Sequence, residues 1–234
     1  MKAVFSFLFL LGSLTIVQSQ TKIEVDDYHS IDAFGAVDIE LIQSDKSYII
    51  IDYNRVDKED MVADVSNGTL RLKIKNKHYM DEWSSNKYKK TDYVRVKAYY
   101  TSLREIEGNA GVIIKSKQPI VSKKISIDCS MGAQVDLIIV ADYTKLRSSM
   151  GGELTLNGKT DFLDIRSSMG SDIQAENFKA NVVDISASMG SVIRVHAEKE
   201  LEASTSLGAQ VFYSGDPNKR HASSNLGGEV KHRN

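Results

Sequence analysis

Ser130-Met131-Gly132-Ala133 is the first of six copies of one short motif, and the recurrence of this motif decides the fold. The glycines follow one another at intervals of 19, 19, 20, 18 and 19 residues. A spacing this regular indicates a repeat protein in which each unit packs against its neighbours. The other copies are Ser149-Met150-Gly151-Gly152, Ser168-Met169-Gly170-Ser171, Ser188-Met189-Gly190-Ser191, Ser206-Leu207-Gly208-Ala209 and Asn225-Leu226-Gly227-Gly228.

Apolar residues flank these glycines at every second position, which is the period of a β-strand. The positions between them are mostly polar, so one face of each strand is expected to form a core. Each unit is therefore predicted to be a strand, a tight glycine turn, a strand and a second turn, such as Asn157-Gly158 or Glu176-Asn177. Three residues after the glycines stand Val135, Leu154, Ile173, Ile193, Val211 and Val230, and five before them stand Ile127, Leu146, Ile165, Ile185, Ala203 and Ala222.

A two-strand unit of this length cannot bury its apolar face alone, whereas stacked copies bury it in one continuous core. We therefore predict an all-β fold, a parallel β-helix or solenoid of two-strand coils with a repeat of about 19 residues. An antiparallel meander of hairpins is the alternative, but hairpin pairing does not require the same residue type at the same offset in every unit. The bend glycines are expected to supply a positive φ or a tight corner; they are Gly132, Gly151, Gly170, Gly190, Gly208 and Gly227.

The first half of the chain is less regular but also has the pattern of strands. Residues 31–42 alternate between apolar and polar, and Asn67-Gly68 stands between two strand-like runs as a hairpin turn does. We treat residues 20–234 as a single solenoid domain. In this interpretation the irregular β part, residues 31–115, caps the regular repeats of residues 124–230.

Residues 1–19 have the composition of a secretory signal peptide, with Lys2 ahead of an apolar run and small residues before the cleavage point. The apolar run of about 15 residues is shorter than the roughly 20 that a membrane span needs. We therefore expect an exported protein with no transmembrane segment in the mature chain. The net charge of −1 argues against a nucleic-acid partner, and the 1 cysteine excludes an intramolecular disulfide framework.

These features together resemble the auto-transporter adhesin head family known as the GIN domain. The resemblance covers residues 31–230 and implies a β-helix of two sheets, without recognised catalytic residues, in the envelope of a Gram-negative bacterium. The location would be the periplasm, the outer-membrane surface or the medium, and adhesion is the role implied by analogy. The family's bend resembles Gly-Ser-Gly, so the methionine before each glycine is a departure. Besides the bends, the resemblance rests on Phe34-Gly35-Ala36-Val37-Asp38-Ile39, Asn67-Gly68-Thr69-Leu70 and Tyr213-Ser214-Gly215-Asp216-Pro217.

The sequence offers little for chemistry, and we predict no catalytic residues, no metal site and no cofactor. The serine before each bend recurs like a structural residue, whereas a serine nucleophile occurs once with a matched histidine and acid. Asp164, Asp184 and Glu202 share one offset, and such an acidic ladder leaves a polysaccharide-active β-helix enzyme open. Neighbouring arginines Arg147 and Arg166 favour the simpler interpretation of a balanced outer face. Cys129 shares its offset with small residues, so we expect it inside the bend.

Two features are candidates for binding a glycan or a cell-surface protein. The first is a loop that mixes aromatic and basic side chains, Trp83, Tyr79, Tyr88 and Lys87. The second is the row of residues just before the bend glycines. We expect this row to point inward and seal a corner of the core; pointing outward, it would be an apolar partner surface. Its members are Met131, Met150, Met169, Met189, Leu207 and Leu226.

The last unit ends at Asn234 without an obvious capping segment, which predicts end-to-end association or another homo-oligomer. The function we predict is that of an exported, non-enzymatic cell-envelope protein acting in adhesion or surface binding. A polysaccharide-active enzyme and a structural envelope-assembly protein remain the alternatives.

Overall fold

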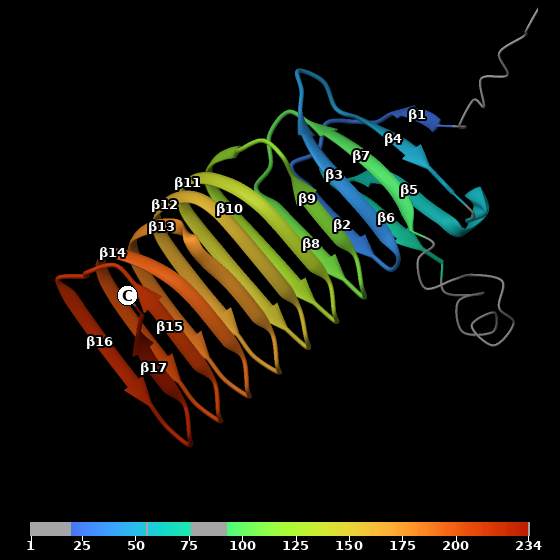
Figure 1. The fold of residues 1–234 in the computed structure, drawn as a ribbon. Coiled ribbons are helices and arrows are strands. Elements are labelled where there is room, and N and C mark those ends of the chain that lie inside the picture. Colours follow the sequence, from blue (N-terminus) through green and yellow to red (C-terminus); the bar gives the residue numbers. More distant parts are fainter. Residues whose placement is uncertain (1–19, 55, 76–92, 234) are drawn as a thin grey trace, which may run out of the picture.

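The computed structural model describes residues 20–54, 56–75 and 93–233, which form a β-solenoid of about seven turns (Figure 1). Most strand pairs are parallel, with each coil hydrogen-bonded to the coil before and after it. The predicted all-β parallel solenoid with an irregular N-terminal region is confirmed.

The regular part of the solenoid consists of long strands that run from one glycine bend to the next. Neighbouring strands keep a register in which equivalent residues of the repeat lie side by side, as Leu146, Ile165 and Ile185 do. These three side chains are buried, and their ladder runs along the core. The strands are β10 (Ile120–Ser130), β11 (Gln134–Ser149), β12 (Glu153–Ser167), β13 (Asp172–Ala187), β14 (Val192–Thr205), β15 (Gln210–Ser214), β16 (Lys219–Ser224) and β17 (Glu229–His232).

In β11 to β14 the corner opposite to the glycine bends is a curve in a continuous strand, where the sequence predicts a separate second turn. Strand β12 passes through Asn157 and Gly158 without a break, and Figure 1 shows the ribbons curving over at this end. The register between neighbouring strands shifts here, between Thr155 and Asn157 in one pair and between Ala175 and Lys179 in the next. Parallel hydrogen bonding resumes on both sides of the shift, which is why the two strands merge into one in these coils, whereas β15 and β16 of the last coil stay separate.

Parallel stacking begins within the irregular N-terminal part, because the β2–β3 coil already lies in register on the β8–β9 coil. The far end differs: β1 with β4, β4 with β7 and β5 with β6 are antiparallel pairs. The elements are β1 (Gln20–Glu24), β2 (Ser30–Phe34), β3 (Val37–Gln43), β4 (Tyr48–Asp52), the 3₁₀ turn η1 (Lys58–Asp60), β5 (Met61–Ser66), β6 (Thr69–Ile74), β7 (Val94–Tyr100), β8 (Glu105–Asn109) and β9 (Ile113–Ser116).

Small side chains fill the inside of the glycine bends. Cys129 is fully buried, its Sγ lies 3.2 Å from the carbonyl oxygen of Ala133, and burial raises the pKa of its thiol to about 12. In the next coils Ser148 Oγ donates to the carbonyl oxygen of Gly152 at 3.1 Å, and Ser171 Oγ donates to that of Ser148 at 3.1 Å. The expectation that Cys129 is an interior residue is confirmed, and the thiol stays protonated.

Candidate functional site

Each repeat bend is a two-residue turn with positive φ at both central residues. In the first bend φ is 53° at Met131 and 71° at Gly132, and the N–H of Ala133 donates to the carbonyl oxygen of Ser130 at 3.1 Å. Positive φ at both positions is the mark of a type I′ turn. The expected positive φ of the bend glycines is therefore confirmed.

Successive bends are hydrogen-bonded to one another along the edge of the solenoid. The N–H of Gly132 donates to the carbonyl oxygen of Met150, and that of Gly151 to the carbonyl oxygen of Met169, each at 3.1 Å. The same contact continues through the later bends to Leu226. The turns are thus held at the strand spacing and form one straight, rigid edge.

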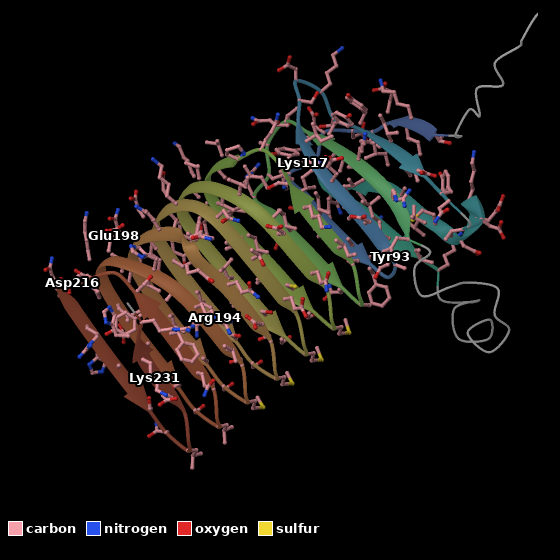
Figure 2. The ribbon with its side chains drawn as sticks, in the orientation of Figure 1. Tyr93, Lys117, Arg194, Glu198, Asp216 and Lys231 are labelled. Carbon is pink, nitrogen blue, oxygen red and sulfur yellow. The ribbon has the colours of Figure 1, made fainter. Side chains whose placement is uncertain are left out.

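The residues before the glycines lie at the tips of these bends, and their side chains are exposed. This result corrects the favoured expectation of an inward row. Inward alternation holds only while the backbone is extended, and two residues with positive φ turn the side chain out of the core. Figure 2 shows the sulfur atoms in line along the edge. We call this row the bend ridge; its exposed fractions are 43% for Met131, 48% for Met150, 46% for Met169, 48% for Met189, 49% for Leu207 and 76% for Leu226.

A polar groove of about 410 Å³ runs beside the bend ridge on the strands that enter the bends. Serines at the position before the ridge residue, such as Ser149, Ser168 and Ser188, line it. Two stacked arginines, Arg147 and Arg166, also line it, together with Asp128, which is the register partner of Arg147. We call this feature the serine groove. Its arginines and its repeating serines are visible in the sequence, but their convergence on one groove beside the ridge is not.

The acidic ladder forms on an outer face as expected, since Asp164 is the register partner of Asp184, and Asp184 that of Glu202. Asp164 is mostly buried; Tyr143 donates to it at 3.3 Å, and Arg166 Nε lies 3.6 Å from its Oδ1. The pKa of Asp184 is raised by burial, with the charges of Asp164 and Glu202 adding to the shift.

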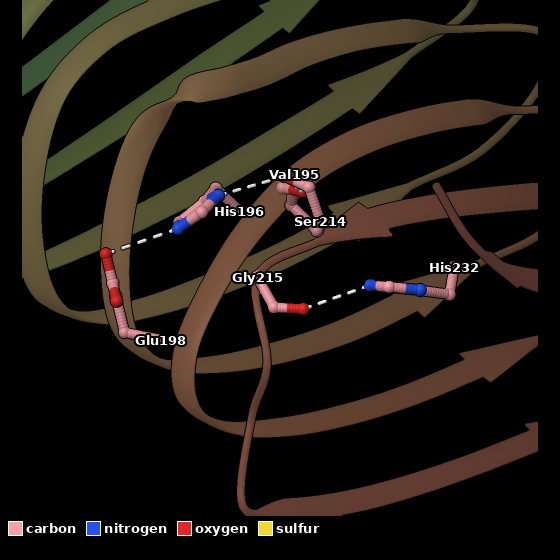
Figure 3. Close-up of polar contacts among 6 residues, drawn as sticks. All are labelled: Val195, His196, Glu198, Ser214, Gly215 and His232. Atoms are coloured by element: carbon pink, nitrogen blue, oxygen red, sulfur yellow. Dashed lines mark hydrogen bonds and ion pairs between the residues drawn. The ribbon is translucent and has the colours of Figure 1, made fainter. Parts of the chain in front are cut away.

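A chain of polar contacts that the sequence analysis missed joins the last coils at the second corner (Figure 3). His196 Nδ1 lies 2.9 Å from Ser214 Oγ, and His196 Nε2 lies 3.2 Å from Glu198 Oε1. His196 and Ser214 are register partners, and the only signal was their spacing of one repeat. A serine, a histidine and a carboxylate hydrogen-bonded in this order can activate a nucleophile. Here the contact between His196 and Ser214 also links neighbouring coils. A second link is made by His232, whose Nε2 donates to the carbonyl oxygen of Gly215 at 3.0 Å.

The C-terminal coil presents polar side chains where earlier coils have core residues. Arg220 stands in register with Leu201, and His232 with Tyr213. Arg220 Nη1 donates to the hydroxyl of Tyr213 at 2.6 Å, and the ring of His232 lies against that of Tyr213. The sequence predicts a last unit without an obvious capping segment, and the structure places these polar side chains at its core positions.

Several expectations lie outside the described residues. The aromatic loop with Tyr79, Trp83, Lys87 and Tyr88 is one, and the signal peptide of residues 1–19 is another. Within the described ranges there is no group of three or more His, Cys, Asp or Glu side chains that could hold a metal ion. Over the same residues, no helix has the length and apolarity needed to cross a membrane.

The family model described as "Putative auto-transporter adhesin, head GIN domain" matches residues 27–217. The chain belongs to this family.

Solved structures share the fold of this GIN domain at low sequence identity. A "putative adhesin" from Bacteroides fragilis has 20% identity and a TM-score of 0.79, and a "putative adhesin" from Parabacteroides distasonis has 19% and 0.69. A "putative lipid binding protein" from Parabacteroides distasonis has 20% and 0.65. In all three, 92% of this chain and 96% of the other are covered. The curated proteins give no match.

Proposed function

We propose that this GIN domain is an exported, non-enzymatic protein of the bacterial envelope that binds a surface along its rigid edge. The carrying observation is the bend ridge, which places an exposed methionine or leucine at each of six hydrogen-bonded bends. Many equal contacts in a line suit a repetitive or extended surface, because they act together once one has formed. A catalytic centre gains nothing from such repetition.

The family and its solved relatives support an adhesin-like role, since the names they carry are adhesin and lipid-binding protein. Export and removal of residues 1–19 belong to the proposal, as does the place of residues 20–234 in one solenoid domain. Cleavage is tested by N-terminal sequencing of the secreted chain, which we expect to begin at Gln20.

The experiment for surface binding is a screen of the purified mature chain against bacterial cells, a glycan array and phospholipid films. Trp83→Ala tests the aromatic loop, and Met150→Asn with Met169→Asn tests the bend ridge. We expect binding that the ridge variant loses. Loss in Trp83→Ala alone would move the site to the loop, and no binding to any surface would leave the structural assembly role as the better explanation.

Polysaccharide cleavage remains the enzymatic alternative, favoured by the raised pKa of Asp184 beside Asp164. Two neighbouring carboxyl groups, one of them with a raised pKa, are the arrangement that glycosidases use. The variants Asp184→Asn and Ser214→Ala should leave any polysaccharide-cleaving or ester-cleaving activity of the preparation unchanged. Activity that disappears with either substitution would establish an enzyme.

A further inference from the structure

The bend ridge has methionine or leucine at a backbone position that disfavours both. Positive φ is uncommon outside glycine, asparagine and aspartate, and the first central residue of a type I′ turn is asparagine or glycine by strong preference. The same chain uses that preferred residue elsewhere: Asn67-Gly68, with φ of 52° and 72°, turns between β5 and β6. Six unfavourable choices in line indicate that the side chains themselves are needed.

Packing does not supply the reason, because the ridge side chains are about half exposed or more. The inside of each bend is already filled by small residues such as Cys129 and Ala133. A Cβ added at Gly151, next to Met150, would have nothing within 4 Å, so the tip of the bend stands in open space. The ridge therefore faces an environment that is not part of the described fold.

The shape of the ridge selects among occupants. It is convex, one side chain wide and about 24 Å long at the usual strand spacing. Six half-exposed side chains offer on the order of 500 Å², less than the about 800 Å² that each partner buries in a stable protein interface. Two such ridges also cannot interlock as flat faces do. A fluid bilayer, in contrast, closes around a convex apolar edge, and flexible methionine adapts to it.

The serine groove adds the polar half of such a contact. Arg147 and Arg166 are stacked in neighbouring coils, and Ser149 and Ser168 line the same groove. Asp128 lines it as well, and Arg166 Nε lies 3.6 Å from Asp164 Oδ1, so the two guanidinium groups are partly balanced by carboxylates. Guanidinium and hydroxyl groups are the usual protein partners of phosphate oxygens. Because the groove lies alongside the ridge, apolar side chains in the acyl region would leave these groups at the depth of the phosphates.

We infer that the bend ridge and the serine groove together dock the solenoid, edge first, on the surface of a phospholipid bilayer. This inference rests on the proposed function and specifies the surface that is bound. The ridge residues enter the boundary between headgroups and acyl chains, and the two arginines contact lipid phosphates.

The test is flotation of the mature chain with vesicles of phosphatidylethanolamine and phosphatidylglycerol in equal amounts. The triple variant Met150→Asn, Met169→Asn and Met189→Asn keeps the turns, because asparagine is preferred at this position. We expect its vesicle partitioning to fall by about tenfold or more. The variant Arg147→Gln with Arg166→Gln should bind several-fold more weakly at low salt and resemble the wild type at high salt, where charge is screened.

Val121→Thr is the matched control, because Val121 is an exposed apolar residue, at 63%, away from the ridge. It should bind vesicles like the wild type.

Equal vesicle binding by the triple Asn variant would overturn the inference, as would a wild-type chain that binds cells or glycans but not vesicles. The second outcome leaves the proposed function standing, whereas failure on every surface overturns both. A wild-type dimer that the triple variant loses would also overturn it, by assigning the ridge to a second copy.

Discussion

The hairpin turn at Asn67-Gly68 and the bend at Met150-Gly151 have nearly the same backbone, with φ of 52° and 72° in the first and 50° and 73° in the second. They differ in what stands at the tip. Asparagine suits the left-handed conformation, whereas methionine in this conformation is strained by about 1 kcal/mol. The hairpin thus carries the residue that the backbone prefers, and the bend carries one that only an outside contact explains.

The largest expected change in the free energy of unfolding comes from comparing a buried and an exposed residue of one coil. Ile165 lies in the buried ladder, and Met169 lies four residues later on the bend ridge. Ile165→Ala should lower the free energy of unfolding by about 2–5 kcal/mol, because it removes buried methylene groups and leaves a cavity. Met169→Ala should change it by less than about 0.5 kcal/mol. Urea unfolding measures both, and equal losses would mean that the ridge belongs to the core.

The hairpin offers the reverse substitution at an exposed tip. Asn67→Met places at the hairpin the residue that the bends carry, in the same left-handed backbone. We expect a loss of about 0.5–1 kcal/mol in the free energy of unfolding, from strain that the asparagine avoids. Asn67→Gly is the control and should be nearly neutral. If Asn67→Met were as stable as the wild type, methionine would carry no penalty in this turn and the comparison would fail.

The smallest expected change in the free energy of unfolding concerns the acidic ladder, which lies on an outer face away from the bend ridge. The pKa of Asp184 in the folded chain lies above its ordinary value, so the folded state holds this proton more tightly than the unfolded state. Stability therefore falls as the pH rises through the window between the ordinary and the raised pKa. Asp184→Asn should be slightly more stable than the wild type near neutral pH and equal to it in acid. Unfolding midpoints at both pH values measure this, and a less stable variant at neutral pH would contradict the sign.

The repeat predicted the fold well because equivalent residues of stacked units lie side by side. Glycine spacing and alternating apolar residues were enough to place Ile127, Leu146 and Ile165 in one ladder and Cys129 inside the bend. The direction of Met150 could not be obtained this way, since counting by two assumes an extended backbone and the turn interrupts it. The contrast with Asn67-Gly68 was nevertheless present in the sequence, as a methionine where such turns prefer asparagine.

Contacts between coils were harder to predict than contacts within the repeat. His196 and Ser214 stand at the same offset from Gly190 and Gly208 and pair in an unshifted register, but the spacing alone does not say which side chains at that offset bond to one another. The covering of the C-terminal end by Arg220 and His232 follows from the register as well, because each occupies a core position of the preceding coil. These positions break the apolar pattern, and that break was the available signal for polar groups in the last coil.

The most direct test of the central claim is the unfolding midpoint in urea of the variant with Met150→Asn, Met169→Asn and Met189→Asn. If the methionines are kept for a contact outside the fold, their left-handed backbone is strained without any gain in stability. Their replacement by asparagine should therefore raise the free energy of unfolding, by about 1–3 kcal/mol in total. A midpoint above that of the wild type is the predicted result. A midpoint below it would show that the methionines hold the solenoid together, and would contradict the assignment of the bend ridge as a binding edge.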